Sequence, residues 1–223
     1  GMIMKAIREN DLDKNTIVVF TSDNGPWLSY GKHSGSAGIY REGKGTTWEG
    51  GQRVPCIVWY PKEIKAKSEI SNPLMGTDWV PTFASVTKSK LSNNKIDGKN
   101  IWPTLTLQSE KDPHEALFFY YNVNSLHGVR YGDWKMYFPH RYRTLNGKEG
   151  RGDGKPIKYE YVDLEEIELY NLKKDPSENK NVYNQFPNIA NKIKALAEIK
   201  RREIGDDLTN IIGSENRLVG KTE

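Results

Sequence analysis

Apolar residues near the start of the chain form unbroken runs rather than alternating patterns. Thr16–Phe20 contains no polar alternation, and Gly25 and Pro26 follow it closely. Such a run is typical of a strand that is buried on both faces, as in a parallel sheet. Cys56–Tyr60 is a second apolar run and predicts a second strand, in which Cys56 is expected to be a small buried side chain.

Helical patterns occur at three places: Met2–Asn10, a segment capped by Asp78 that runs through Val86, and Asn188–Ile204. The last segment places apolar side chains on one face, and Gly205 is suited to stop it. Before it, four short strands are expected at Leu117–Tyr121, Leu126–Tyr131, Trp134–Phe138 and Ile167–Asn171. The pair Gly132-Asp133 lies between the second and third of these strands and predicts a tight hairpin.

Residues 88–115 are rich in turn formers, which indicates a boundary between two regions. The pattern on each side differs, because unbroken apolar strands precede this stretch and short separate strands follow it. The sequence therefore predicts an α/β region at 1–112 and a small α+β region at 113–223. We find no internal repeat.

Two oxygen-bearing side chains follow the first predicted strand. Ligands collect at the carboxyl ends of strands in open α/β sheets, and Asp23 and Asn24 stand at that place. Carboxylate and amide oxygens are ligands that hard cations prefer. The alternative is that Asp-Asn-Gly is ordinary turn chemistry without a metal.

A glycine-rich stretch, Gly43-Lys-Gly-Thr-Thr-Trp-Glu-Gly-Gly51, leads into the second predicted strand. Glycines on both sides of Lys44 leave the backbone open and the ammonium accessible, as an anion site requires. A lysine acts there as a mobile point charge that suits a tetrahedral oxyanion. The alternative is a flexible loop with a solvated lysine, but that does not explain so many special backbone positions in one place.

Taken together, these two motifs resemble the later half of the type I sulfatases, the arylsulfatase-like branch of the alkaline-phosphatase superfamily. Further resemblance lies in Asp78–Thr82, in Gly128–Lys135 and in Glu168–Pro176. The resemblance implies the C-terminal part of an alkaline-phosphatase-like α/β sandwich, followed by a four-stranded antiparallel sheet with a C-terminal helix. It covers the chain from about Met4 to about Ile204.

The resemblance also implies a function, the hydrolysis of aryl or glycan sulfate esters by a formylglycine- and metal-dependent mechanism. Asp23 and Asn24 would be ligands of a divalent cation, expected to be Ca²⁺, and Lys44 would be catalytic and contact the sulfate. His33 and His140 are candidate substrate contacts, since residues near His140 reach over the active site in this family. A lone histidine is more often structural, so that alternative stays open for both.

The formylglycine motif Cys/Ser-x-Pro-x-Arg is missing from these 223 residues, since Cys56 precedes Ile57-Val58 and Ser71-Asn72-Pro73 lacks the arginine. We therefore expect the chain alone to be inactive, and an exposed edge of its first strand invites self-association. Two alternatives remain: a non-catalytic remnant or anionic-glycan-binding module, and a phosphatase or phosphodiesterase of the same superfamily.

Charge and composition limit the classes of binding partner that the chain is expected to have. The net charge is +4, and between Lys135 and Lys158 seven basic residues face two acidic ones, which predicts a basic rim for sulfated glycans. The alternative is an ordinary solvated face. No nucleic-acid-binding module accompanies this stretch, and no segment approaches the roughly 18 apolar residues of a membrane helix. One cysteine leaves the compartment open, and a periplasmic or secreted parent enzyme is the expectation.

Overall fold

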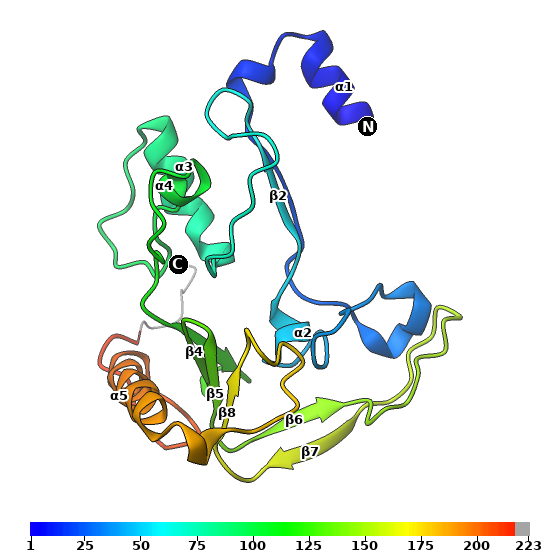
Figure 1. Cartoon of the computed structure of the whole chain (residues 1–223), viewed down its shortest axis with the longest axis vertical. Helices are drawn as coiled ribbons and strands as arrows, with labels where there is room; N and C mark the ends of the chain where they lie inside the picture. Colours follow the sequence, from blue (N-terminus) through cyan, green and yellow to red (C-terminus); the bar gives the residue numbers. More distant parts are fainter. Residues whose placement is uncertain (217–223) are drawn as a thin grey trace, which may run out of the picture. The chain divides into compact units, whose positions relative to one another are not determined.

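A computed structural model of the chain describes residues 1–216. Their backbone separates into two compact units, each described by itself below (Figure 1). Unit 1 comprises residues 1–23 and 54–115, and unit 2 comprises residues 24–53 and the chain from Ala116 onward. The segment 24–53 thus belongs with the C-terminal half of the chain. The predicted division of the sulfatase fold at 112/113 stays a prediction.

Unit 1 begins with helix α1 (Met2–Glu9) and the short helix η1 (Asp13–Asn15), which lead into strand β1 (Val18–Thr21). Strand β1 pairs with β2 (Cys56–Trp59), the second predicted strand, so both apolar runs form strands. The pairing is antiparallel, and the prediction of a parallel strand buried on both faces is wrong for this structure. An apolar run indicates burial but does not encode the direction of its partner.

The β1–β2 ribbon leaves large apolar side chains in contact with solvent. Phe20 is 64% exposed and Ile57 is 62% exposed, because the described residues form only a two-stranded sheet here. Cys56 is exposed as well, which corrects the expectation of a buried thiol. Its place at the start of β2, opposite Thr21 at the end of β1, leaves it at the end of this ribbon.

The remaining part of unit 1 is helical. It contains η3 (Gly76–Asp78), α3 (Trp79–Thr87) and α4 (Trp102–Leu105), so the predicted helix after Asp78 is confirmed. The Asp78 side chain does not cap α3; it accepts hydrogen bonds from the backbone N–H groups of Met75 and Lys99, both 2.8 Å, and lies 2.9 Å from His114 Nε2. Burial raises the pKa of Asp78, but these partners hold it below its ordinary value.

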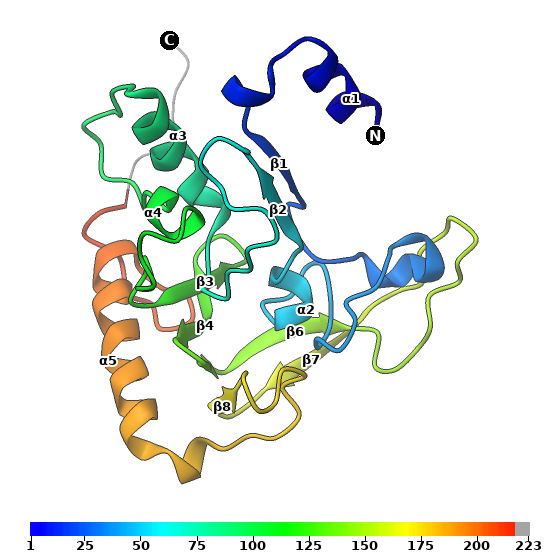
Figure 2. The same cartoon turned by 45° about the horizontal axis from the view of Figure 1, so that its top comes forward.

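Unit 2 is built on an antiparallel sheet with strand order β3-β4-β5-β8. The strands are β3 (Leu117–Tyr121), β4 (Ser125–Tyr131), β5 (Trp134–Tyr137) and β8 (Glu168–Asn171), as the sequence predicts. Helix α5 (Pro187–Ile204) lies along this sheet (Figure 2). Its Ile193 and Ala197 belong to the same buried core as Leu126, Met136 and Leu169 of the sheet. Gly205 ends the helix with a positive φ of 85°.

A second, two-stranded sheet in unit 2 was not predicted. Strands β6 (His140–Thr144) and β7 (Glu160–Leu164) pair antiparallel, with Arg141 opposite Asp163. Both strands are rich in charged residues and lack the apolar pattern that marks the other strands. The short helices η2 (Leu28–His33), α2 (Glu49–Gln52) and η4 (Tyr183–Gln185) complete the unit. Across residues 1–216, none of the helices combines the length and the apolar character that spanning a membrane demands.

Candidate functional site

The segment after β1 and the glycine-rich loop are joined through their backbones in unit 2. The N–H of Gly25 donates to the carbonyl of Gly51 at 3.0 Å, and the N–H of Lys44 donates to the carbonyl of Pro26 at 2.9 Å. A Cβ at position 25 would lie 1.8 Å from the carbonyl oxygen of Gly50, so only glycine permits this approach. The two motifs that predict chemistry are therefore neighbours.

The loop of residues 43–51, called the lysine loop below, is ordered by bonds within itself. The Thr46 hydroxyl donates to the carbonyl of Gly43 at 2.9 Å, and the Gly50 N–H donates to the carbonyl of Arg41 at 2.8 Å. Residues 46–51 are buried, and the last three belong to α2. These bonds satisfy backbone groups that a buried loop would otherwise leave unpaired.

A buried lysine from the sheet holds the middle of the lysine loop. Lys135, on β5, is 0% exposed, and its ammonium donates to the Thr47 carbonyl at 2.7 Å and to Glu49 Oε1 at 2.8 Å. Arg130 adds a longer contact of 3.5 Å to Glu49 Oε2. Burial raises the pKa of Glu49, but Lys135 and the neighbouring arginines hold it below its ordinary value, so this carboxylate is charged.

A second buried carboxylate, from the segment after β8, holds the same loop. Glu178 Oε2 accepts the backbone N–H of Glu49 at 2.9 Å, and its Oε1 lies 2.5 Å from the Tyr137 hydroxyl. Burial raises the pKa of Glu178 above its ordinary value, even though Lys135 and the hydroxyl of Tyr137 act against this shift. Glu49, Lys135, Tyr137 and Glu178 are called the buried network below.

Trp48 fills the space beneath the lysine loop and is fully buried among aromatic rings. The Arg41 guanidinium lies 3.6 Å from its ring centroid, and the Tyr137 ring centroid lies 4.0 Å away. Arg41 also donates to the hydroxyls of Tyr142 and Tyr170, at 3.2 and 3.3 Å. A stacked arginine of this kind keeps its charge while it covers the indole face.

Lys44 itself stands at the outer end of this loop. Its side chain is half-buried, with Nζ 5.3 Å from the Trp27 ring centroid, and Arg143 donates to its backbone carbonyl at 2.5 Å. Within residues 1–216 no carboxylate pairs with the Lys44 ammonium. The side chain is thus positioned by its backbone and remains available for an anion.

The two predicted metal ligands, Asp23 and Asn24, fall in different units of the structure. Asp23 is exposed at the end of β1, in unit 1, and Asn24 begins the unit 2 segment that binds the lysine loop. Their oxygens suit a hard cation, but two residues supply fewer ligands than the six to eight of Ca²⁺. No cluster of three or more His, Cys, Asp or Glu side chains able to hold a metal occurs among the described residues.

The two candidate histidines differ in environment. His33 is exposed at the end of η2, whereas His140 is buried and stacks on His127, with the ring centroids 3.8 Å apart. His140 Nδ1 lies 2.6 Å from the Phe138 carbonyl, and its Nε2 has no hydrogen-bond partner in the part of the chain described. Burial lowers the pKa of both stacked rings, that of His127 to about 3, so both are neutral.

The predicted basic rim is partly neutralised by the fold. Lys148 pairs with Glu160, and Arg151 pairs with Asp153 at 3.1 Å. Arg143 turns toward the Lys44 carbonyl and lies 4.4 Å from the Tyr159 ring centroid. The excess of bases in the sequence therefore overstates the free positive charge on this surface.

Comparison with known proteins places the chain in a family. Residues 1–89 match the Sulfatase family, and residues 112–216 match the C-terminal region of aryl-sulfatase. The chain is a type I sulfatase sequence of the alkaline-phosphatase superfamily. The arylsulfatase of Hemicentrotus pulcherrimus is 36% identical over 192 residues, which are 79% of this chain and 34% of that protein.

Solved sulfatase structures share the fold. One from Bacteroides thetaiotaomicron, described in connection with the metabolism of multiple glycosaminoglycans, is 27% identical with a TM-score of 0.71 and is matched over 89% of this chain and 41% of its own. Another, solved with its substrate D-glucosamine-2-N,6-O-disulfate, is 25% identical with a TM-score of 0.63, over 90% of this chain and 37% of its own. This sulfatase chain spans about a fifth to two-fifths of the length of the curated relatives it matches.

Sulfatases of this family depend in general on a divalent metal and a formylglycine. What sequence reasoning missed in this chain is the buried network and His127. The signal for Lys135 was a charged residue inside an otherwise apolar strand, between Trp134 and Met136. Glu178 gave no comparable signal, because a glutamate after Asp175-Pro176 reads as a turn residue. Glu178 reaches the lysine loop only through a contact with Glu49, which lies 129 positions earlier in the chain.

Proposed function

We propose that this chain forms part of an enzyme that hydrolyses sulfate esters, with Lys44 as a catalytic residue that binds the sulfate. The observation that carries the proposal is the backbone connection, within unit 2, between Gly25 and Pro26 and the lysine loop. It brings the segment that follows Asn24 to the loop of Lys44, whose ammonium has no carboxylate partner among residues 1–216. A phosphatase of the same superfamily is less favoured, because both family matches are to sulfatases.

In the proposed reaction, Lys44 contacts the sulfate oxygens and stabilises negative charge that develops as the ester bond breaks. Asp23 and Asn24 would hold a divalent cation, and the hard oxygen donors make Ca²⁺ the proposed ion. Such an ion would supply Lewis-acid polarisation of the sulfate oxygens. The nucleophile in this family is a formylglycine, whose motif does not occur in the 223 residues. We therefore expect the isolated chain to lack turnover.

The substrate we propose is a sulfated carbohydrate or an aryl sulfate. Support comes from a related structure that contains a sulfated glucosamine as its substrate. His33 and His140 are proposed substrate contacts: His33 is exposed at the end of η2, and Nε2 of His140 has no hydrogen-bond partner among the described residues. The buried network has an indirect role, because it fixes the backbone from which Lys44 projects.

The test is turnover of an aryl sulfate by a full-length sulfatase that carries these residues. Lys44→Ala should lower kcat by roughly 10²–10³, the usual loss for one such charge-stabilising donor. Its stability should hardly change, since a partly exposed loop lysine contributes little packing. Lys32→Ala, which removes an exposed lysine of η2, is the matched control and should retain activity. Equal activity of Lys44→Ala and Lys32→Ala would contradict the assignment.

A further inference from the structure

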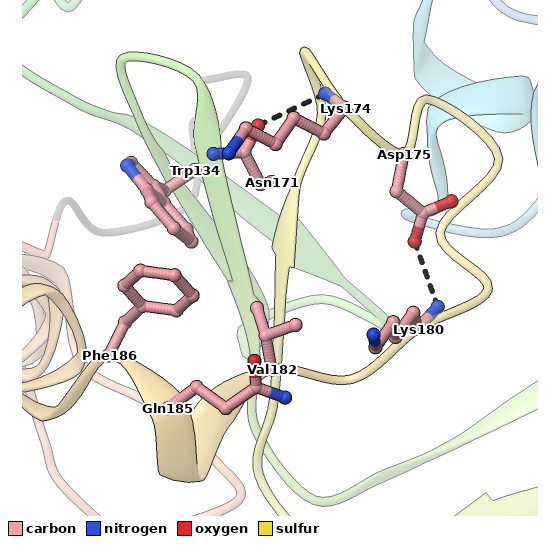
Figure 3. A pocket seen from close by; sticks show the side chains of 8 residues that line it. All are labelled: Trp134, Asn171, Lys174, Asp175, Lys180, Val182, Gln185 and Phe186. Atoms are coloured by element: carbon pink, nitrogen blue, oxygen red, sulfur yellow. Dashed lines mark hydrogen bonds between the residues drawn. The ribbon is translucent and has the colours of Figure 1, made fainter.

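A pocket of about 360 Å³ opens in unit 2 where β5 begins and β8 ends (Figure 3). None of the residues that line it belongs to the lysine loop, and none is among the candidate site residues above. Its walls come from the start of β5, the turn after β8 and the short helix η4. The pocket is therefore a separate feature of the fold and requires an explanation of its own.

One wall of the pocket consists of two aromatic rings. The centroids of Trp134 and Phe186 lie 4.6 Å apart, with the ring planes inclined by 54°. Trp134 is half-buried against the core of the sheet, while Phe186 is exposed at the start of α5. Such faces offer a flat apolar surface with negative electrostatic character, which suits the weakly positive C–H groups of a sugar ring.

Cationic and amide groups complete the lining of the pocket. Lys174 and Lys180 line the pocket, and Asn171 and Gln185 add side-chain amides (Figure 3). Among the residues described, neither lysine ammonium has a carboxylate within ion-pair distance. An apolar face with a few convergent polar groups is the usual composition of a small-ligand site.

The single acidic residue of the pocket is occupied by the backbone. Asp175 Oδ2 accepts the N–H groups of Asn179 and Lys180, both at 2.8 Å. Asn171 Oδ1 accepts the N–H of Lys174 at 3.1 Å, which fixes the other end of the turn. The carboxylate therefore shapes the turn that carries both lysines, and the two ammonium groups keep a net positive charge toward the pocket.

We propose that this pocket binds a sulfated sugar residue, at a site distinct from the one that contains Lys44. That the ligand is a sugar is inferred from the proposed function. That it carries a negative charge is inferred from the two lysines that line the pocket. Lysine is a compact point charge that suits a tetrahedral sulfate, and the planar fork of arginine, which matches a carboxylate bidentately, does not occur in the lining. The pocket would hold part of a sulfated polymer while another residue is at the reactive site.

Binding of short dextran sulfate to the 223-residue chain tests the proposal, with dissociation constants measured by calorimetry. Unsulfated dextran and a hyaluronan oligosaccharide, which carries carboxylates without sulfate, are the comparison ligands. Lys174→Gln/Lys180→Gln should weaken dextran sulfate binding about tenfold, as expected for two exposed charge contacts. Phe186→Leu should weaken it by several-fold through loss of the aromatic face.

The matched control is Lys173→Gln/Lys90→Gln, which removes the same charge from exposed lysines outside the pocket and outside the basic rim. It should change the dissociation constant less than twofold. Equal weakening by the control and by the pocket variant would overturn the proposal, because it would indicate non-specific attraction. Hyaluronan that binds as tightly as dextran sulfate would overturn the assignment to sulfate.

The test of the pocket can fail or succeed independently of the test of the proposed catalytic role of Lys44. The pocket variant should weaken dextran sulfate binding by the same factor with and without Lys44→Ala, since Lys44 does not line the pocket. In the complete enzyme, the pocket variant should raise KM for a sulfated polymer and leave turnover of a small aryl sulfate intact. A pocket variant that abolishes aryl sulfate turnover would contradict the separation of the two sites.

Discussion

The lysine loop of unit 2 and the β1–β2 ribbon of unit 1 both carry sequence that marks the family, but their surroundings are opposite. Glu49 in the loop binds side chains that lie 86 and 129 positions later in the chain. The ribbon pairs only with itself in the described structure, and Phe20 and Ile57 on it are exposed. The polar loop is thus enclosed, and the apolar ribbon is not.

This difference shows what each kind of residue specifies. A buried charge is stable only when its partner stands in one position, so Lys135 and Glu49 define the loop's place on the sheet. An apolar side chain is stabilised by burial from water, which is not directional, so any surface of complementary shape can bury it. The buried network therefore sets geometry for Lys44, whereas Phe20 and Ile57 indicate a surface suited to further packing.

The largest expected effect comes from breaking the buried network on one side. Lys135→Met removes the ammonium and leaves Glu49 charged and buried without its main partner. Loss of one partner of a buried ion pair costs about 3–5 kcal/mol, so the unfolding free energy of unit 2 should fall by this amount. Urea denaturation, followed by the signal of buried Trp48, measures it.

Lys148→Met is the matched control, because Lys148 pairs with Glu160 on an exposed part of the β6–β7 sheet. An exposed pair contributes about 0–1 kcal/mol, so its loss should be small. Adding Glu49→Gln to Lys135→Met should recover part of the stability, since it removes the unpaired charge. Similar losses of unfolding free energy for Lys135→Met and Lys148→Met would mean that the buried ion pair stabilises the fold no more than an exposed one.

A smaller effect is expected from pH, through the stacked histidines of unit 2. Burial lowers the pKa of folded His127 to about 3 from a reference value of 6.5, so only the unfolded chain binds this proton between those values. The stability that the neutral, buried His127 ring contributes to the folded state is complete above pH 6.5. It is lost as the pH falls, by at most about 1.4 kcal/mol per pH unit for each proton. The aromatic side chains that face the two stacked histidines are Tyr121, 5.6 Å from the His127 ring centroid, and Tyr137 and Tyr142, 6.2 and 5.8 Å from that of His140.

His127→Phe isolates this effect, because it keeps a ring against His140 without a titrating group. Unfolding free energies at pH 7 and pH 5 should differ less in the variant than in the parent chain. The comparison also cancels the opposite contribution of Glu178, whose raised pKa makes folding more favourable as the pH falls. An identical pH dependence in both chains would show that His127 is not buried and neutral in solution.

The smallest effect on stability should come from the ribbon. Phe20→Thr introduces a β-branched residue suited to a strand and removes an exposed ring, so the unfolding free energy should change by no more than about 0.5 kcal/mol. Self-association should decrease, since exposed apolar strands invite pairing with another chain. Sedimentation of the two chains at matched concentrations measures this, and unchanged association would exclude Phe20 as its cause.

Sequence patterns predicted the parts of the fold that follow local rules. The strands Leu117–Tyr121 and Ile167–Asn171, the hairpin at Gly132-Asp133 and the helix that stops at Gly205 were found within a few residues. The β6–β7 sheet was missed because His140–Thr144 is mostly charged or polar. The antiparallel direction of β1 depends on β2 and is not encoded in either run alone.

The candidate site was predictable in part. Lys44 stood out because glycines surround it, and the structure brings its loop to the segment that follows Asn24. The partners that hold this loop could not be found from local sequence, since Lys135 and Glu178 come together with Glu49 only after the sheet forms. The roles of Asp23, Asn24, His33 and His140 stay predictions.

The most direct test of the account is amide hydrogen exchange in the lysine loop of the 223-residue chain. The N–H groups of Lys44, Glu49 and Gly50 donate to Pro26, Glu178 and Arg41, respectively, so their exchange should be as slow as that of the β4–β5 core. Lys135→Met should accelerate exchange at Glu49 and Gly50, and Lys148→Met should not. Fast exchange of these three amides in the unmodified chain would contradict the claim that the buried network positions Lys44.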